Sequence, residues 1–148
     1  MKISIITVCF NSEATIELCL NSVASQSWAN VEHIIVDGCS TDSTLQLIEE
    51  NRQGNMVVVS EPDNGIYDAM NKGLSLATGD YVAYLNSDDL YTNEDVLNLV
   101  ANKTIATSAD CIIGDVHVNV KKSKRGHPLD FSCQPPRKNI LPTKWARI

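Results

Sequence analysis

The sequence predicts an α/β protein in which a mostly parallel sheet carries helices on both faces. Short apolar runs rich in β-branched residues recur along the chain, and such runs are typical of strands buried on both faces. Segments with apolar residues at helical spacing lie between these runs. Strands that alternate with helices form right-handed crossovers, which place the strands parallel to one another.

Five strands are expected. The runs that predict them cover residues 2–9, 32–36, 56–60, 81–85 and 111–120. The second half of the last run alternates valine with polar residues, as strands often do. From residue 121 the periodicity disappears, and four of the five prolines lie in this final stretch. We therefore expect a folded domain over residues 1–120 and an irregular, basic segment over residues 121–148.

The connections between the strands are expected to be helical. Apolar stripes predict helices over residues 16–24, around residues 45–48 and over residues 94–100. Gly79 stands where a left-handed C-terminal cap of a further helix belongs. The cleanest stripe, which predicts that helix, comprises Ile66, Ala69, Met70, Gly73, Leu74 and Ala77.

The composition is that of an ordinary globular domain and excludes several classes of protein. The 148 residues are 43% hydrophobic, which excludes intrinsic disorder. No apolar run approaches the roughly 18 to 20 residues that span a bilayer, and the first eight residues lack the features of a signal peptide. We therefore expect a cytoplasmic protein.

Cysteine spacing and charge narrow the class further. The 5 cysteines form no C-x-x-C pair, so neither a disulfide framework nor a zinc site is expected. Residues 1–120 hold 17 acidic and 4 basic side chains, which argues against nucleic acid as a partner. Residues 121–148 hold 8 basic side chains and 1 acidic one. Two interpretations of this segment remain open: contact with an anionic membrane surface, or an unpacked piece whose partner sequence is missing.

Polar and acidic loops follow the predicted strands. In an open parallel sheet, ligands bind outside the carboxyl ends of the strands. Carboxylates about 4 Å apart repel by roughly 4 kcal/mol at an effective dielectric near 20. Such a cluster is tolerable if some carboxylates point to water, if some take raised pKa values, or if a divalent cation binds between them. Oxygen ligands select Mg²⁺ or Mn²⁺. The loops expected to converge are residues 10–11, 37–38, 61–65 and 86–89.

No glycine-rich phosphate motif is present. The chain lacks both G-x-G-x-x-G and G-x-x-x-x-G-K-[ST], so a bound diphosphate would need a metal to neutralise it. Asp88 or Asp89 suits that metal, because Mg²⁺ often binds one or two carboxylates together with substrate phosphates. Asp37 suits another task, since a carboxylate accepts a hydrogen bond from a uracil imide or a ribose hydroxyl. A sugar nucleotide satisfies both.

Four ordered segments then carry a resemblance to a known family. They are residues 4–11 (SIITVCFN), 36–42 (VDGCSTD), 60–73 (SEPDNGIYDAMNKG) and 79–89, which includes LNSDD. In this order and spacing they resemble family 2 glycosyltransferases over about residues 3–118, and the third resembles the bacterial branch that builds exopolysaccharide, capsule or lipopolysaccharide. The resemblance implies a GT-A nucleotide-binding fold, a nucleotide-diphospho-sugar donor with UDP favoured, a Mn²⁺ or Mg²⁺ ion, and inversion at the anomeric carbon.

The resemblance assigns donor-binding roles to five residues on one side of the site. It implies that Val8 and Phe10 line the base pocket and that Asp37 binds the base. It further implies that Gly65 and Asn71 shape the wall near the diphosphate.

The family's D-x-D motif corresponds to Asn86-Ser87-Asp88, which completes the implied nucleotide-sugar site. Asp88 is then the metal ligand. Asn86 stands where the first aspartate usually stands, and it can still meet a ribose hydroxyl. The alternative for Asp88 and Asp89 is a solvated helix cap.

The resemblance places the catalytic base and the acceptor site beyond the segment that matches Ile140-Leu141-Pro142. An inverting transfer needs a base within hydrogen-bond reach of the acceptor hydroxyl. The chain is therefore expected to be the donor half of the enzyme, as a truncated frame, a fragment or a subunit needing a partner. Two functions follow: transfer of the sugar to a growing cell-surface glycan or lipid-linked acceptor, or sugar-nucleotide binding without turnover.

Overall fold

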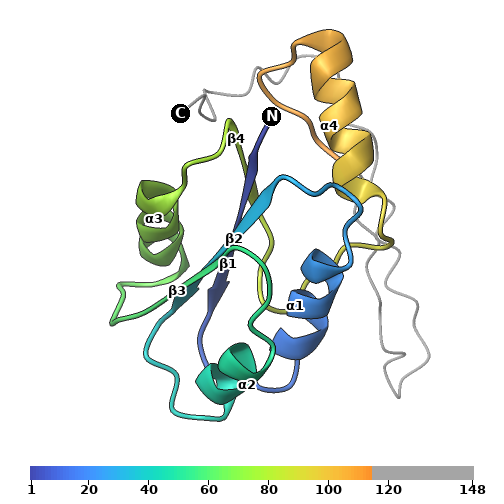
Figure 1. Ribbon diagram of the computed structural model, residues 1–148. Helices are drawn as coiled ribbons and strands as arrows, with labels where there is room; N and C mark the ends of the chain where they lie inside the picture. Colours follow the sequence, from blue (N-terminus) through green and yellow to red (C-terminus); the bar gives the residue numbers. More distant parts are fainter. Residues whose placement is uncertain (115–148) are drawn as a thin grey trace, which may run out of the picture.

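A computed structural model describes residues 1–114, which form a four-stranded parallel sheet of order β3-β2-β1-β4 (Figure 1). Each neighbouring pair of strands is parallel. The predicted fold class is therefore confirmed. The strands are β1 (Ile3–Cys9), β2 (Val31–Asp37), β3 (Met56–Ser60) and β4 (Tyr81–Tyr84).

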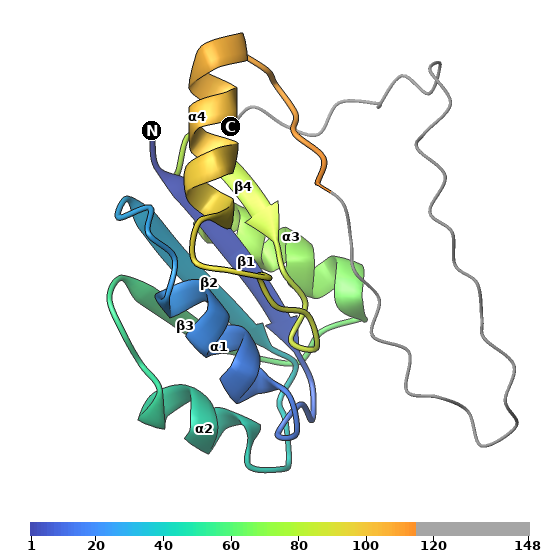
Figure 2. The same cartoon turned by 90° about the vertical axis from the view of Figure 1, so that its right-hand side faces the viewer.

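Helices cover both faces of the sheet, as the sequence predicts. Figures 1 and 2 show α3 alone on one face, with α1, α2 and α4 on the other. None of the helices within residues 1–114 is long and apolar enough to cross a bilayer. The helices are α1 (Ile16–Ala24), α2 (Thr44–Glu50), α3 (Ile66–Leu76) and α4 (Val96–Thr107).

Alternating residues of the central strand supply the two halves of the core. All seven residues of β1 are buried. Ile6 packs with Ala69 of α3, whereas Ile5 packs with Leu97 of α4 on the opposite face. Because successive side chains of a strand point to opposite faces, one buried strand anchors both helical layers.

Two expectations about local structure are wrong. Residues 111–114 are not a strand, and the rest of the stretch predicted as one lies outside the described residues, as does the segment 121–148. Gly79 is not a left-handed cap, because α3 ends with Ala77 in extended backbone. Gly79 is instead required by a close approach, since a Cβ there would lie 2.6 Å from Ser4 Oγ and 2.8 Å from Ser4 N.

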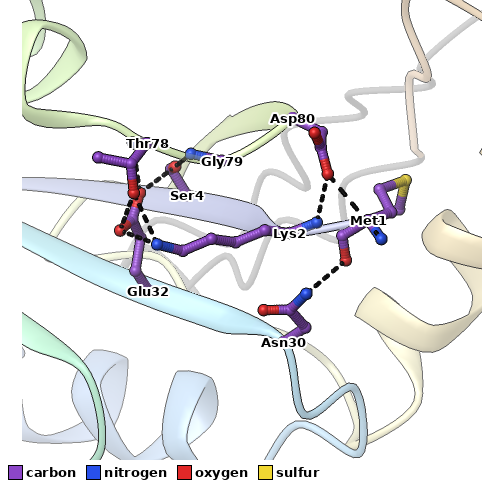
Figure 3. Close-up of polar contacts among 8 residues, drawn as sticks. All are labelled: Met1, Lys2, Ser4, Asn30, Glu32, Thr78, Gly79 and Asp80. Atoms are coloured by element: carbon purple, nitrogen blue, oxygen red, sulfur yellow. Dashed lines mark hydrogen bonds and ion pairs between the residues drawn. The ribbon is translucent and has the colours of Figure 1, made fainter.

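A buried carboxylate holds the amino-terminal edge of the sheet together (Figure 3). Glu32 of β2 accepts hydrogen bonds from Ser4 Oγ and from Thr78, and pairs with Lys2 Nζ at 2.6 Å. Burial alone raises the pKa of Glu32, but these hydrogen bonds outweigh it and lower the pKa from 4.5 to about 2. The network fixes the connection between α3 and β4 against β1 and β2.

The register brings the carboxyl ends of the strands to one edge. Cys9 pairs with Asp37, and Asp37 pairs with Ser60, so β1, β2 and β3 end level with one another. On the other side of β1, Tyr84 pairs with Ile6 and Leu85 N donates to Ile6 O at 3.0 Å. The four loops that follow the strands therefore leave the sheet at the edge where ligands bind in parallel α/β proteins.

Candidate functional site

Hydrogen bonds join the loops at the carboxyl edge into one surface. Gly38 N donates to Cys9 O at 2.9 Å, and Glu61 N donates to Asp37 O at 3.0 Å. Across the other side of β1, Ser12 Oγ and Ser87 Oγ lie 2.9 Å apart. Loops far apart in sequence are thus held together, as the topology predicts.

Asp37 lies at the centre of this surface, but its side chain is fully buried. Its Oδ2 accepts from Ser40 N at 3.0 Å and from Ser60 Oγ at 2.7 Å. Its Oδ1 accepts from Ser40 Oγ and, weakly, from Cys9 Sγ at 3.7 Å. Burial and the neighbouring Asp37 raise the pKa of Cys9, so the thiol stays protonated and can donate. Every strong acceptor position of this carboxylate is therefore used internally.

Phe10 and Val8, both expected near the base, lie in different environments. Phe10 is 61% exposed beyond the end of β1, whereas Val8 is buried under α3 with Ile6 and Val36. Of these two residues, Phe10 therefore offers its side chain at the surface and Val8 does not.

Asp63 occupies the space that a side chain at position 38 would need. A Cβ on Gly38 would lie 2.6 Å from Asp63 Oδ2 and 3.5 Å from the ring of Phe10. The other oxygen, Oδ1, accepts from Gly65 N at 2.8 Å. The sequence placed Asp63 in one of the loops expected to converge at this edge, and the fold brings its carboxylate over the end of β2.

Gly65 and Asn71 flank this loop and the start of α3. Gly65 has φ 108°, a backbone conformation that favours glycine, and both residues are exposed. Lys72 fastens the loop to α3, because its Nζ donates to Pro62 O at 2.6 Å and pairs with Glu61 at 3.0 Å. Lys72 therefore holds in place the loop that is expected to form the wall near a diphosphate.

The Asn86-Ser87-Asp88 segment leaves three different groups at the edge. Ser87 is buried and bonded to Ser12, whereas Asp88 is exposed. Asn86 Nδ2 donates to Asp89 Oδ2 at 3.3 Å, but Asn86 Oδ1 is buried and accepts no hydrogen bond from residues 1–114. An unpaired buried acceptor is costly, so it indicates a position for an external donor.

The carboxylates do not gather into the single cluster that the sequence suggested. Within the described residues, no three Asp, Glu, His or Cys side chains lie close enough to hold a metal ion. Asp37 is turned inward to its serines, and Asp63 is bonded to Gly65. A cation at this edge would have Asp88 as its protein ligand and would need substrate oxygens to complete its shell, which fits the coordination habit of Mg²⁺.

A polar stripe on α1 also contacts this region, and the sequence pattern did not single it out. Cys19 Sγ donates to Asn86 O at 3.5 Å, and Ser22 Oγ accepts from Tyr91 N at 3.2 Å. The pattern in α1 was read from its apolar positions alone. The available signal was the spacing of Cys19 and Ser22, three residues apart on the helix.

A comparison with protein families shows which family this chain belongs to. The model of glycosyl transferase family 2 matches residues 4–146. The chain belongs to this family. Its resemblance, and the GT-A-like fold expected from it, are thereby confirmed.

Relatives of this family-2 chain are named glycosyltransferases. A PGL/p-HBAD biosynthesis glycosyltransferase of Mycobacterium bovis is 33% identical over 141 residues, which are 93% of this chain and 55% of the relative. The chain thus spans about half the length of this relative.

Solved structures of this fold carry nucleotides. S. aureus TarS (residues 1–349) is 32% identical with a TM-score of 0.71 over 83% of this chain and 39% of TarS, and it has also been solved with UDP-GlcNAc and with UDP. The Pyrobaculum calidifontis mannosyltransferase PcManGT, solved with GDP-Man and Mn²⁺, shares the fold at 24% identity and a TM-score of 0.66 over 70% of this chain and 32% of PcManGT.

Proposed function

We propose that this chain forms the donor-binding half of an inverting glycosyltransferase. The donor is a nucleotide-diphospho-sugar, with UDP favoured, and the acceptor is a growing cell-surface or lipid-linked glycan. One observation carries the proposal: two polar groups with different properties lie in the same segment at the carboxyl edge of the sheet. Asn86 Oδ1 is buried and accepts no hydrogen bond from residues 1–114, whereas Asp88 is exposed. The likeness to TarS, itself solved with UDP, supports a uridine donor.

The nucleoside is proposed to bind over the ends of β1 and β2. Phe10 offers an exposed aromatic face for the base, and Val8 supports the end of the same strand from the core. Asp37 accepts the imide N–H of the base at Oδ1 once the hydroxyl of Ser40 turns away from that oxygen. Asn86 Oδ1 accepts from a ribose hydroxyl, which would satisfy its unused hydrogen-bonding capacity.

The diphosphate is proposed to bind between the α3 side of the site and the segment after β4. Gly65 and Asn71 form one wall, and Asn86, Ser87 and Asp88 form the other. Asp88 would hold Mn²⁺ or Mg²⁺, and such an ion, when bound, stabilises the departing diphosphate as a Lewis acid. The neutral Asn86 keeps one negative charge away from the phosphates.

The acceptor half of the reaction is proposed to lie outside the described residues. We assign no catalytic base within residues 1–114. A membrane-linked acceptor agrees with the basic composition of residues 121–148, which would bind the anionic inner face of a membrane.

Replacement of Asp88 by asparagine tests the proposal. Calorimetry should show that the parent chain binds UDP more tightly when Mn²⁺ is added. In Asp88→Asn, the UDP affinity measured with Mn²⁺ should be at least tenfold lower than in the parent. The side chain is exposed, so the melting temperature should change little. Glu50→Gln removes an equally exposed charge from α2 and should leave Mn²⁺-dependent binding intact.

Two results would contradict this assignment. Equal behaviour of Asp88→Asn and Glu50→Gln would remove Asp88 from the metal site, and absence of any UDP binding by the parent would reject the donor site. Release of UDP from a UDP-sugar then separates a transferase from a binding module without turnover.

A further inference from the structure

Asp88 lies in a segment that has no regular structure of its own. Residues 85–95, between β4 and α4, contain neither helix nor strand. A ligand side chain binds an ion tightly only when its backbone is held near the productive geometry, because ordering a free loop costs conformational entropy. A turn in which Asp89 N donates to Asn86 O at 3.0 Å orders the backbone next to Asp88, and contacts from outside the segment fix where this turn lies.

Helix α1 and the turn that follows it supply these restraints. Cys19 and Ser22 lie three residues apart on α1, and Gln26 comes directly after Ser25, the C-cap of the helix. Cys19 Sγ donates to Asn86 O at 3.5 Å, and burial raises its pKa from 9 to about 11, which keeps the thiol protonated. Ser22 Oγ accepts from Tyr91 N at 3.2 Å. Figure 2 shows the segment passing α1 on its way from β4 to α4.

Of these three residues, Gln26 makes the most hydrogen bonds to the segment and to α4. Its Nε2 donates to Asn93 O at 2.7 Å, and its Oε1 accepts from Leu97 N at 3.0 Å. Leu97 is in the first turn of α4, where Asp95 makes no side-chain cap. Gln26 thus joins the end of the irregular segment to the start of α4 and supplies the cap that α4 lacks.

We infer that Ser22 and Gln26 are positioning residues that hold the Asp88 segment and thereby set its affinity for a divalent cation. Neither residue contacts the proposed ion site. Each acts on the backbone of the segment, Ser22 at Tyr91 and Gln26 at Asn93 and Leu97. The inference rests on the proposed function for the ion, but the restraint itself involves only hydrogen bonds within the chain.

The variant Gln26→Met tests the restraint with two measurements. Methionine keeps the length of the side chain and removes its hydrogen bonds to Asn93 and Leu97, together with the one that Nε2 donates to Ser22 O at 3.1 Å. The Leu97 amide should exchange with solvent at least tenfold faster in the absence of metal, because its acceptor is gone. Mn²⁺ affinity, measured by calorimetry in the presence of saturating UDP, should fall about tenfold.

Val23→Ala is the matched control for lost stability. Val23 lies on α1, next to Ser22, and packs in the core with Ile3 and Ile5. As an apolar residue, it makes no side-chain hydrogen bond to the segment. This variant should lower the melting temperature while leaving Mn²⁺ affinity within about twofold at a temperature where it is folded. Equal losses of affinity in Gln26→Met and Val23→Ala would show a merely structural role and overturn the inference.

Ser22 offers an independent test with its own rescue. Ser22→Ala removes the acceptor of the Tyr91 amide, and Ser22→Thr restores a hydroxyl. We expect faster exchange at Tyr91 and weaker Mn²⁺ binding in the first variant only. Unchanged Mn²⁺ affinity in both Gln26→Met and Ser22→Ala would reject the inference while leaving the proposed function standing. Absence of Mn²⁺-dependent UDP binding in the parent would instead reject the proposed function.

Discussion

At the scale of single residues, the site contains one satisfied and one unsatisfied polar group. Asp37 receives strong hydrogen bonds from Ser40 and Ser60, whereas Asn86 Oδ1 receives none from residues 1–114. The sequence and its family resemblance single out both residues. They do not reveal this difference, because Ser60 lies 23 residues from Asp37 and meets it only through the pairing of β2 with β3.

Asp37→Asn should separate binding from folding. Ser40 N can only donate, so the amide oxygen of the asparagine should face it, with the NH₂ group toward the Ser40 hydroxyl, which can accept. Stability should then fall by only about 1 kcal/mol. UDP binding should weaken at least tenfold by calorimetry, because an NH₂ group cannot accept from the base imide.

Ser60→Ala is the matched control for Asp37. It removes a donor from the same carboxylate and leaves the acceptor available to the base, so stability should fall while UDP affinity stays within a few-fold. Wild-type affinity in Asp37→Asn would show that this carboxylate serves the fold alone.

At the scale of elements, α3 depends on a glycine for its distance from the sheet. A Cβ on Gly73 would overlap a methyl group of Ile6 and lie 3.4 Å from Val36. Alanine improves helix propensity by about 1 kcal/mol, but overpacking costs about 1 to 3 kcal/mol. Gly73→Ala should therefore destabilise the protein by up to about 2 kcal/mol in urea unfolding.

An exposed position on the same helix gives the comparison. Ser75→Ala should change stability by no more than about 0.5 kcal/mol, because Ser75 bonds only to Lys72 O of its own helix. If Gly73→Ala stabilised the protein as a free helical position would, α3 would not pack closely against β1.

The bounds of β1 to β4 were predictable to within about one residue, but the strand expected to begin at residue 111 and the bounds of the last helix were wrong. Pattern alone indicated residues 94–100, whereas α4 runs over Val96–Thr107. Its buried row is Leu97, Ala101 and Thr104, and the polar Thr104 hides the apolar spacing. Thr104 is tolerated in this buried row because its hydroxyl donates to Val100 O at 2.8 Å. This hydrogen bond forms only when the helix is folded.

At the scale of the whole molecule, the two edges of the sheet differ in how their polar groups are satisfied. The amino-terminal edge is closed by the Glu32 network, whereas the carboxyl edge exposes Phe10 and Asp88 and holds an Asn86 oxygen that accepts no hydrogen bond from residues 1–114. The sequence predicted that the four loops after the strands would leave the sheet at one edge, and the register confirms this. It did not predict that the acidic loops would stay apart, because that depends on the internal partners each carboxylate finds.

A buried histidine in the centre of the sheet makes stability depend on pH. Burial lowers the pKa of His33 from 6.5 to about 4, and its Nε2 lies 2.9 Å from Thr7 Oγ1. Between these values the unfolded chain binds a proton that the folded chain does not, so stability falls as pH drops from 6.5 to 4, by up to roughly 3 kcal/mol. The contribution of Glu32 is lost at lower pH, from about 4.5 toward 2.

Urea unfolding between pH 4 and pH 7.5 measures this dependence. His33→Gln keeps a partner for Thr7 but does not titrate, so its stability should vary less with pH over the same interval. An identical slope in the parent and the variant would show that His33 takes up its proton equally in both states.

The central claim is that Asp88 and Asn86, at the carboxyl edge, bind an activated sugar's nucleotide together with a cation. A crystal structure of the chain grown with UDP and Mn²⁺ tests it most directly, because anomalous scattering locates the ion. We expect the Mn²⁺ signal at the Asp88 carboxylate and the diphosphate, with the ribose at Asn86 Oδ1. A nucleotide bound elsewhere, or an ion that does not contact Asp88, would contradict the claim.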